Sequence, residues 1–207
     1  MAAAEGRVAE DQVNARLMTL TDGVLSIAMT LLVLDIRLPM PAKDLDNALL
    51  WQALAGIWPQ VLGYGLSFLV IAALWLSHVR KLRHLRQVNA MLIWLNIGFL
   101  LAVGLVPFTT SLLADSNTAA ATQLYAGVMG FASLMLGLMS LHAGRQGLIA
   151  DRAADEQVRA VTFWQFGTAA VFFVSIGIAA RNADWAKYFW LLLVVQGLWR
   201  RRRAAAG

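Results

Sequence analysis

Long apolar stretches alternate with short polar ones along almost the whole chain. Predominantly apolar runs cover roughly residues 17–36, 53–77, 88–113, 119–143, 160–180 and 184–199. A helix needs about 20 such residues to cross the hydrocarbon core of a bilayer, and lipid requires every backbone group to be satisfied internally. The pattern therefore predicts an all-α integral membrane protein with six transmembrane helices in one domain over residues 1–203, followed by a short tail at 204–207.

The sixth run is shorter than the others. From Asp184 to Trp199, a helix would extend only about 24 Å at a rise of about 1.5 Å per residue. A span of that length needs local thinning of the bilayer or aromatic anchors at the interface. Trp185, Tyr188, Trp190 and Trp199 are placed to serve as such anchors.

The composition agrees with a membrane location, and this location changes how the positive net charge is interpreted. Hydrophobic residues make up 59% of the chain and charged residues 14%, whereas about a quarter of a soluble domain is charged. The net charge of +5 would suit nucleic acid in a soluble protein, but here it fits the positive-inside rule. With both termini in the cytoplasm, 13 of the 17 basic residues face inward: Arg7, Arg16, Arg80, Lys81, Arg83, Arg86, Arg145, Arg152, Arg159 and Arg200 to Arg203.

The sequence carries no pattern that predicts a cofactor or a metal. It contains no cysteine, so a thiolate metal site and a cysteine nucleophile are excluded. Its three histidines, His78, His84 and His142, are scattered, whereas a metal site needs ligands that converge. Composition and charge predict membrane lipid as a partner and give no reason to expect nucleic acid.

The first run combines two stripes of different chemistry. Asp22, Ser26 and Thr30 recur every four residues and so share one helix face. Ile27, Leu31 and Leu34 form an apolar stripe on an adjacent face. The simplest interpretation is that the hydroxyls bond to carbonyls of the preceding turn while the apolar stripe packs or meets lipid.

Other polar residues at membrane depth need hydrogen-bond partners, and small residues there allow close helix packing. His78 closes the second run on the same side as Asp22, and Asn96 lies in the third run, so Asp22 is a candidate acceptor for both. Glycines in spans commonly mark close helix packing. We expect this of Gly98, Gly104, Gly127, Gly130 and Gly137.

The first half of the chain resembles a known family. Arg16-x-x-x-Leu20-Thr21-Asp22, followed by GVLSIAMTLLVLDIRLP, is similar to the R-x-x-x-F-S-D signature that opens the first helix of the transmembrane protein 175 family. SFLVIAALWLSHVRKLRHL and NAMLIWLNIGFLLAVGLVPFTTSLL resemble that family's second and third helices. The resemblance covers about residues 16 to 113. Leu20 and Thr21 depart from the signature's phenylalanine and serine.

The resemblance implies a potassium-permeable cation channel of the cell membrane, assembled as a homotetramer with the first helix lining a central pore. Ile27 would form the constriction, Leu31 and Leu34 further apolar layers, and the Thr30 hydroxyl would contribute to selectivity. The signature positions, including Leu20, would hold the helix bundle together on the cytoplasmic side. The polar packing network expected there comprises Arg16, Thr21, Asp22, Ser26, His78 and Asn96.

Two other classes of function remain open at this point. Asp22 and His78 could serve as protonatable sites of a proton- or ion-coupled secondary transporter, although the inverted repeats and broken helices usual in transporters are not evident. Ser77, His78, Ser140 and His142 could supply the groups of a membrane enzyme. The chain lacks Gly-x-Ser-x-Gly, His-Glu-x-x-His and paired carboxylates at mid-membrane, so an enzyme is not expected.

Overall fold

The computed structural model describes residues 2–39, 46–116, 118–149, 152–193 and 197. In this part of the chain all regular structure is helical apart from one isolated bridge between Leu85 and Ile149. The elements are α1 Ala2–Leu31, the short 3-10 helix η1 Leu32–Asp35, α2 Asn47–Gly56, α3 Trp58–Leu82, α4 Ala90–Asp115, α5 Ala119–Arg145, α6 Arg152–Ala179 and α7 Ala183–Phe189.

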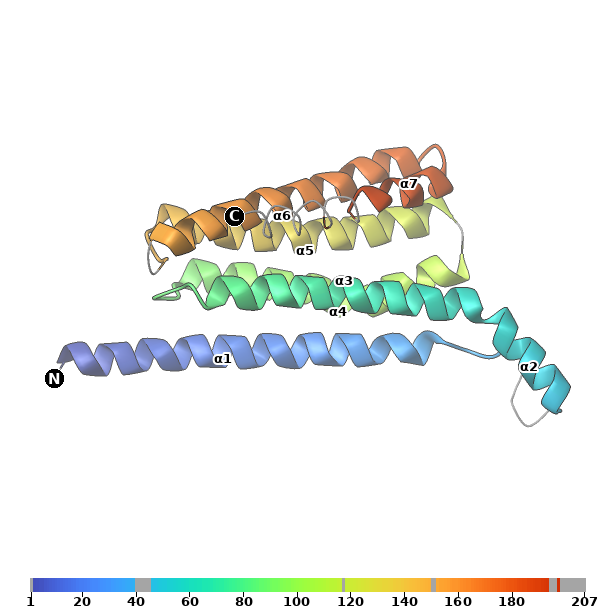
Figure 1. The fold of residues 1–207 in the computed structure, drawn as a ribbon, viewed down its shortest axis with the longest axis horizontal. Coiled ribbons are helices and arrows are strands. Elements are labelled where there is room, and N and C mark those ends of the chain that lie inside the picture. The colour runs from blue at the N-terminus through green and yellow to red at the C-terminus, as the bar shows by residue number, and fades with distance from the viewer. Residues whose placement is uncertain (1, 40–45, 117, 150–151, 194–196, 198–207) are drawn as a thin grey trace.

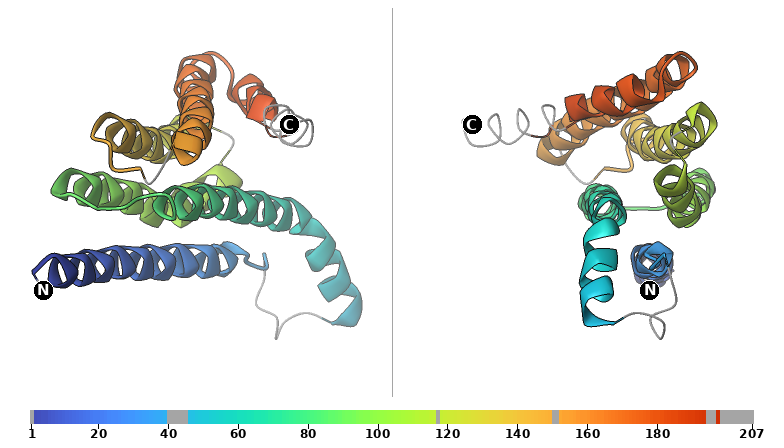
Figure 2. Two further views of the ribbon diagram at one scale, coloured as in Figure 1. Left: turned by 60° about the vertical axis from the view of Figure 1, so that its left-hand side comes forward. Right: turned by 90° about the vertical axis from the view of Figure 1, so that its right-hand side faces the viewer.

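The long helices run roughly side by side in an elongated bundle (Figure 1). Seen from the end, α1 lies at one margin, next to α3 and α4, and α6 lies at the opposite margin (Figure 2). The N-terminus, the α3–α4 connection and the α5–α6 connection share one end of the bundle. The other connections, including the one that carries α2, lie at the opposite end. α1 is therefore a peripheral helix of the single chain.

The all-α membrane architecture is confirmed. By length and composition, five helices among the described residues could cross a membrane: Gln12–Asp35, Trp58–Leu82, Ala90–Asp115, Ala119–Arg145 and Val161–Ala179. The last part of the predicted sixth run and the tail at 204–207 lie outside the described residues, so a sixth span stays a prediction.

The second predicted span begins later than its hydropathy suggested. The apolar run from residue 53 combines two helices, because α2 ends at Gly56 and α3 starts at Trp58. Pro59 lies in the first turn of α3, where a missing N–H costs no helical hydrogen bond. The span then continues to Leu82, five residues beyond the predicted end at residue 77.

Side-chain caps and one glycine set several helix ends. Asp46, Asn89 and Thr118 precede α2, α4 and α5, and each side chain accepts a backbone N–H of the first turn. After α5, Gly147 adopts φ +64°, and the next N–H, that of Leu148, bonds to the carbonyl of Ala143 at 3.0 Å. Glycine suits this left-handed position because it has no Cβ.

α4 and α5 are the most buried of the five spans. Fully buried side chains such as Phe99 and Val103 of α4 and Met129 and Leu136 of α5 form the core. Of the five glycines expected at close contacts, three meet a neighbour. A Cβ would lie 3.1 Å from Met135 at Gly98, 3.0 Å from Phe173 at Gly130 and 3.1 Å from Phe166 at Gly137. Gly104 and Gly127 have nothing within 4 Å among the described residues of the single chain, so that expectation is not met for them there.

Leucine at Gly130 should separate α5 from α6. We expect Gly130→Leu to lower the free energy of unfolding by about 1–3 kcal/mol, the usual cost of overpacking a core, because its side chain would clash with Phe173. Gly127→Leu, on the same helix but facing open space, is the matched control. Thermal unfolding in detergent measures both, and equal losses would contradict the packing interpretation.

Candidate pore-lining face and its polar anchor

One face of α1 and η1 is held by the helix bundle. Leu17, Thr21, Leu25, Ala28 and Leu32 are all buried, and their spacing of three or four residues places them on one side of the helix. This side packs against α3 and α4. The rotation of α1 about its axis is thereby fixed within the subunit.

The predicted apolar stripe faces away from the rest of the chain. Ile27 is 59% exposed, Leu31 43% and Leu34 66%. Leu34 lies in η1, because the α-helix ends at Leu31. Three large apolar side chains thus remain uncovered on a peripheral helix, and burying them requires lipid or other copies of the chain.

A buried polar cluster anchors α1 to α3 and α4 through Thr21, Asn96 and His78. The Asn96 amide Nδ2 donates to Thr21 Oγ1 at 3.0 Å, and Thr21 Oγ1 donates to the carbonyl of Leu17 at 2.9 Å. His78 Nε2 lies 2.7 Å from Asn96 Oδ1. An amide oxygen can only accept, so this contact requires the proton on Nε2. Phe99 stacks on the imidazole with ring centroids 5.5 Å apart.

Asp22 has a different partner from the one its position suggested. Its carboxylate accepts from the indole Nε1 of Trp75 at 2.7 Å, rather than from His78 or Asn96. Trp75 and His78 are three residues apart on α3 and therefore lie on neighbouring turns of one face. α3 thus contacts α1 at two adjacent positions. Trp75 binds Asp22 directly, and His78 reaches Thr21 through Asn96 of α4.

The remaining predicted residues do not join this cluster in the single chain. Arg16 and Ser26 are exposed. Thr30 is also exposed, and its hydroxyl donates to the carbonyl of Ile27 at 2.9 Å. The roles of these three residues in packing or selectivity stay predictions.

Sequence reasoning omitted three groups that belong to this region. Trp75 and Phe99 complete the anchor, and Lys81, which is 5% exposed, donates to the carbonyl of Leu136 in α5 at 2.7 Å. The sequence signals for Trp75 were its helical spacing from His78 and its place in the segment that resembles the family's second helix. No such signal existed for Lys81, which the charge pattern placed in a cytoplasmic loop.

The groups considered for an enzyme do not form a nucleophile–base pair in the described part of the chain. Ser77 accepts a hydrogen bond from Gln165, and Ser140 donates to the carbonyl of Leu136. His142 pairs with Asn89, not with a hydroxyl. The described residues also contain no group of three or more potential metal-ligating side chains.

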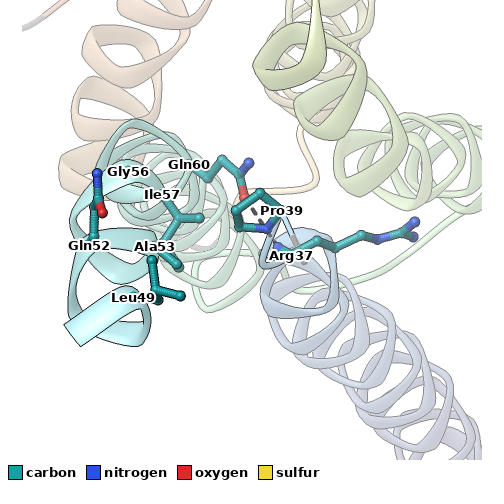
Figure 3. Close-up of a pocket in the computed structure, with 8 residues that line it drawn as sticks. All are labelled: Arg37, Pro39, Leu49, Gln52, Ala53, Gly56, Ile57 and Gln60. Atoms are coloured by element: carbon teal, nitrogen blue, oxygen red, sulfur yellow. Dashed lines mark hydrogen bonds between the residues drawn. The ribbon is translucent and has the colours of Figure 1, made fainter. Parts of the chain in front are cut away.

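A cavity of about 450 Å³ lies at the far end of the bundle from the polar anchor, between α2 and the segment after η1. The backbone N–H of Arg37 donates to Gln60 Oε1 there at 3.1 Å. Figure 3 shows the Arg37 side chain directed away from the other lining residues. None of the predicted site residues lines this cavity. Its walls are Arg37, Pro39, Leu49, Gln52, Ala53, Gly56, Ile57 and Gln60.

The chain is similar in sequence to proteins of a known membrane-channel family. Residues 16–107 match the family described as "Endosomal/lysosomal potassium channel TMEM175". The chain is 31% identical over 176 residues to a protein of Streptomyces collinus named as a potassium channel, covering 82% of this chain and 84% of that protein. A Chamaesiphon minutus protein, also named as a potassium channel, is 30% identical over 158 residues, with 74% and 77% covered.

A solved structure shares the fold. The crystal structure of a lysosomal potassium-selective channel TMEM175 homolog from Chamaesiphon minutus aligns with a TM-score of 0.76. The alignment covers 91% of this chain and 98% of that one, at 24% sequence identity. The helix arrangement described above is thus the arrangement of that structure.

Proposed function

Because the chain belongs to the TMEM175 family, we propose that it is a potassium-permeable membrane channel whose pore is lined by α1 from four copies. Relatives of similar length are named as potassium channels. One peripheral helix cannot enclose a pore by itself, and the resemblance of the single predicted six-helix repeat to the family's prokaryotic channels implies a homotetramer.

The observation that carries the proposal is the division of α1 into two faces. Thr21 is fully buried in the bundle, whereas Ile27 and Leu34 are 59% and 66% exposed. A closed rotational assembly buries the same face of every copy around one axis. With α1 at that axis, the exposed stripe becomes a series of apolar rings, and the buried face holds each helix in position.

Apolar rings would control ion permeation by excluding water from the pore. A narrow apolar constriction tends to lose its water and so opposes the passage of hydrated ions. Potassium holds its hydration shell less tightly than sodium and therefore crosses such a constriction at a lower cost. Ile27 forms the ring nearest the anchor in this proposal, with Leu31 and Leu34 beyond it.

The distribution of charge supports an orientation in the cell membrane with both termini in the cytoplasm. Arg80, Arg83, Arg86 and Arg145 lie at the end of the bundle that carries the N-terminus. Asp35 and Asp115 lie at the opposite end. Cytoplasmic connections carry the excess of basic residues in membrane proteins.

Flux through liposomes tests the proposal. Purified protein reconstituted into vesicles should pass potassium faster than sodium under matched gradients, and protein-free vesicles should pass neither. Chemical cross-linking in the membrane should yield tetramers. Absence of potassium flux, a monomer after cross-linking, or transport of protons without potassium would contradict it, and the last result would favour the transporter that uses Asp22 and His78.

A further inference from the structure

The exposed stripe of α1 does not stop at Ile27. Leu20, seven residues earlier, is 51% exposed, and Val13, a further seven residues back, is 42% exposed. Two side chains seven residues apart on an α-helix differ in direction by only about 20°, because seven residues make nearly two full turns. They are separated by about 10 Å along the helix axis. Leu20 therefore points in nearly the same direction as Ile27, about 10 Å closer to the N-terminal end.

The resemblance implied that Leu20 helps to hold the bundle together, but within the subunit its side chain is exposed, and the anchor prevents it from turning inward. Its neighbour Thr21 is fully buried and receives the amide of Asn96. Leu17, three residues before Leu20, is 6% exposed on the same buried side. Rotating Leu20 into the bundle would pull the Thr21 hydroxyl away from Asn96 and leave polar groups unpaired in a buried place, which costs about 1–3 kcal/mol each.

A glycine separates the Leu20 and Ile27 positions along the stripe. Gly23 is exposed, and a Cβ built there would meet nothing within 4 Å in the single chain. At this level one side of the stripe is backbone without a side chain, and the other side carries the half-buried Val24. The stripe thus has two bulky, exposed apolar layers, separated by a layer that projects less because Gly23 has no side chain and Val24 is half-buried.

We propose that Leu20 lines the same pore as a further apolar ring, separated from the Ile27 ring by a wide layer at Gly23. This inference rests on the proposed function, since it requires α1 to face the pore axis. The Leu20 side chains of the other copies cover the exposed face of each Leu20. An ion entering from the N-terminal side would meet this ring before the Ile27 ring, so the pore contains a second apolar barrier to permeation.

Cysteine modification tests the inference directly, because the chain has no native cysteine. Leu20→Cys is compared with Ile27→Cys in the proposed constriction and Leu69→Cys, whose position on α3 is 66% exposed. A positively charged methanethiosulfonate reagent is added to both sides of reconstituted vesicles. We expect potassium flux through Leu20→Cys and Ile27→Cys to fall about tenfold or more, because a fixed positive charge in a pore repels cations.

The controls separate this inference from the proposed function. Inhibition of Ile27→Cys without Leu20→Cys would overturn the second ring and leave the α1 pore intact. Potassium flux that survives modification at both positions would contradict the α1 pore itself. Equal inhibition of Leu69→Cys would also overturn the inference, because the reagent would then act outside the pore.

A second pair of variants gives a readout that does not depend on modification. Leu20→Ala removes bulk from the proposed ring and should raise potassium flux, whereas Leu20→Trp adds bulk and should lower it. Leu20→Ala leaves no enclosed cavity inside the subunit and Leu20→Trp does not overpack its core, because the Leu20 side chain is half exposed there. Unchanged flux in both variants would overturn the inference.

Discussion

Ile27→Ala is expected to abolish most of the preference for potassium over sodium. Shortening the side chain widens the proposed constriction, so a sodium ion keeps more of its water as it passes. Sodium flux should rise about tenfold if the change removes about 1.4 kcal/mol of barrier. Parallel potassium and sodium flux measurements on reconstituted vesicles give the ratio.

The matched control is Leu101→Ala on α4, where the side chain is 65% exposed. Both substitutions shorten an apolar side chain that has few neighbours inside the subunit. Only the one at Ile27 should alter selectivity. An unchanged flux ratio in Ile27→Ala, or an equal change in Leu101→Ala, would place the constriction elsewhere.

The second large effect is expected from Asn96→Leu. The substitution leaves the His78 Nε2–H without its acceptor and Thr21 Oγ1 without its donor, both at buried positions. An unpaired buried polar group costs about 1–3 kcal/mol, so the unfolding temperature in detergent should drop clearly. Potassium flux should fall as well, because α1 loses the contact that fixes its rotation.

Ser133→Ala provides the control for this prediction. The Ser133 hydroxyl is buried and has no hydrogen-bond partner among the residues that the structure describes, so its removal should break no bond and leave stability nearly unchanged. Thr21→Val should lie between the two variants, because it removes one partner of Asn96 and leaves the histidine contact. If Asn96→Leu and Ser133→Ala are equally stable, the cluster does not anchor α1.

Hydropathy located the five described spans but not the break between α2 and α3. The run that starts at residue 53 is apolar on both sides of Ile57, and hydropathy carries no information about the direction of the backbone. Gly56 and Pro59, three residues apart, were the local signal of a break. They mark the place where one apolar segment becomes two helices.

The anchor was predictable only in part for a related reason. The period of one helix identifies which of its residues share a face, and the charge distribution placed the start of the first helix, with Thr21 and Asp22, on the cytoplasmic side. Pairing those residues with partners requires the relative rotation of two helices, which no single period contains. Asp22 pairs with Trp75 instead of the expected His78, which lies one turn further along α3. Helical periodicity cannot distinguish between two residues one turn apart on the same face.

The two faces of α1 also separate what a mutation can change. Substitutions at Leu25 or Thr21 act on folding, because these side chains are fully buried. Substitutions at Ile27 or Leu34 leave the subunit core intact, because both side chains lie outside it. Under the proposed function, conduction can therefore diverge between relatives without loss of the fold, and variants of this stripe should express as well as the parent protein.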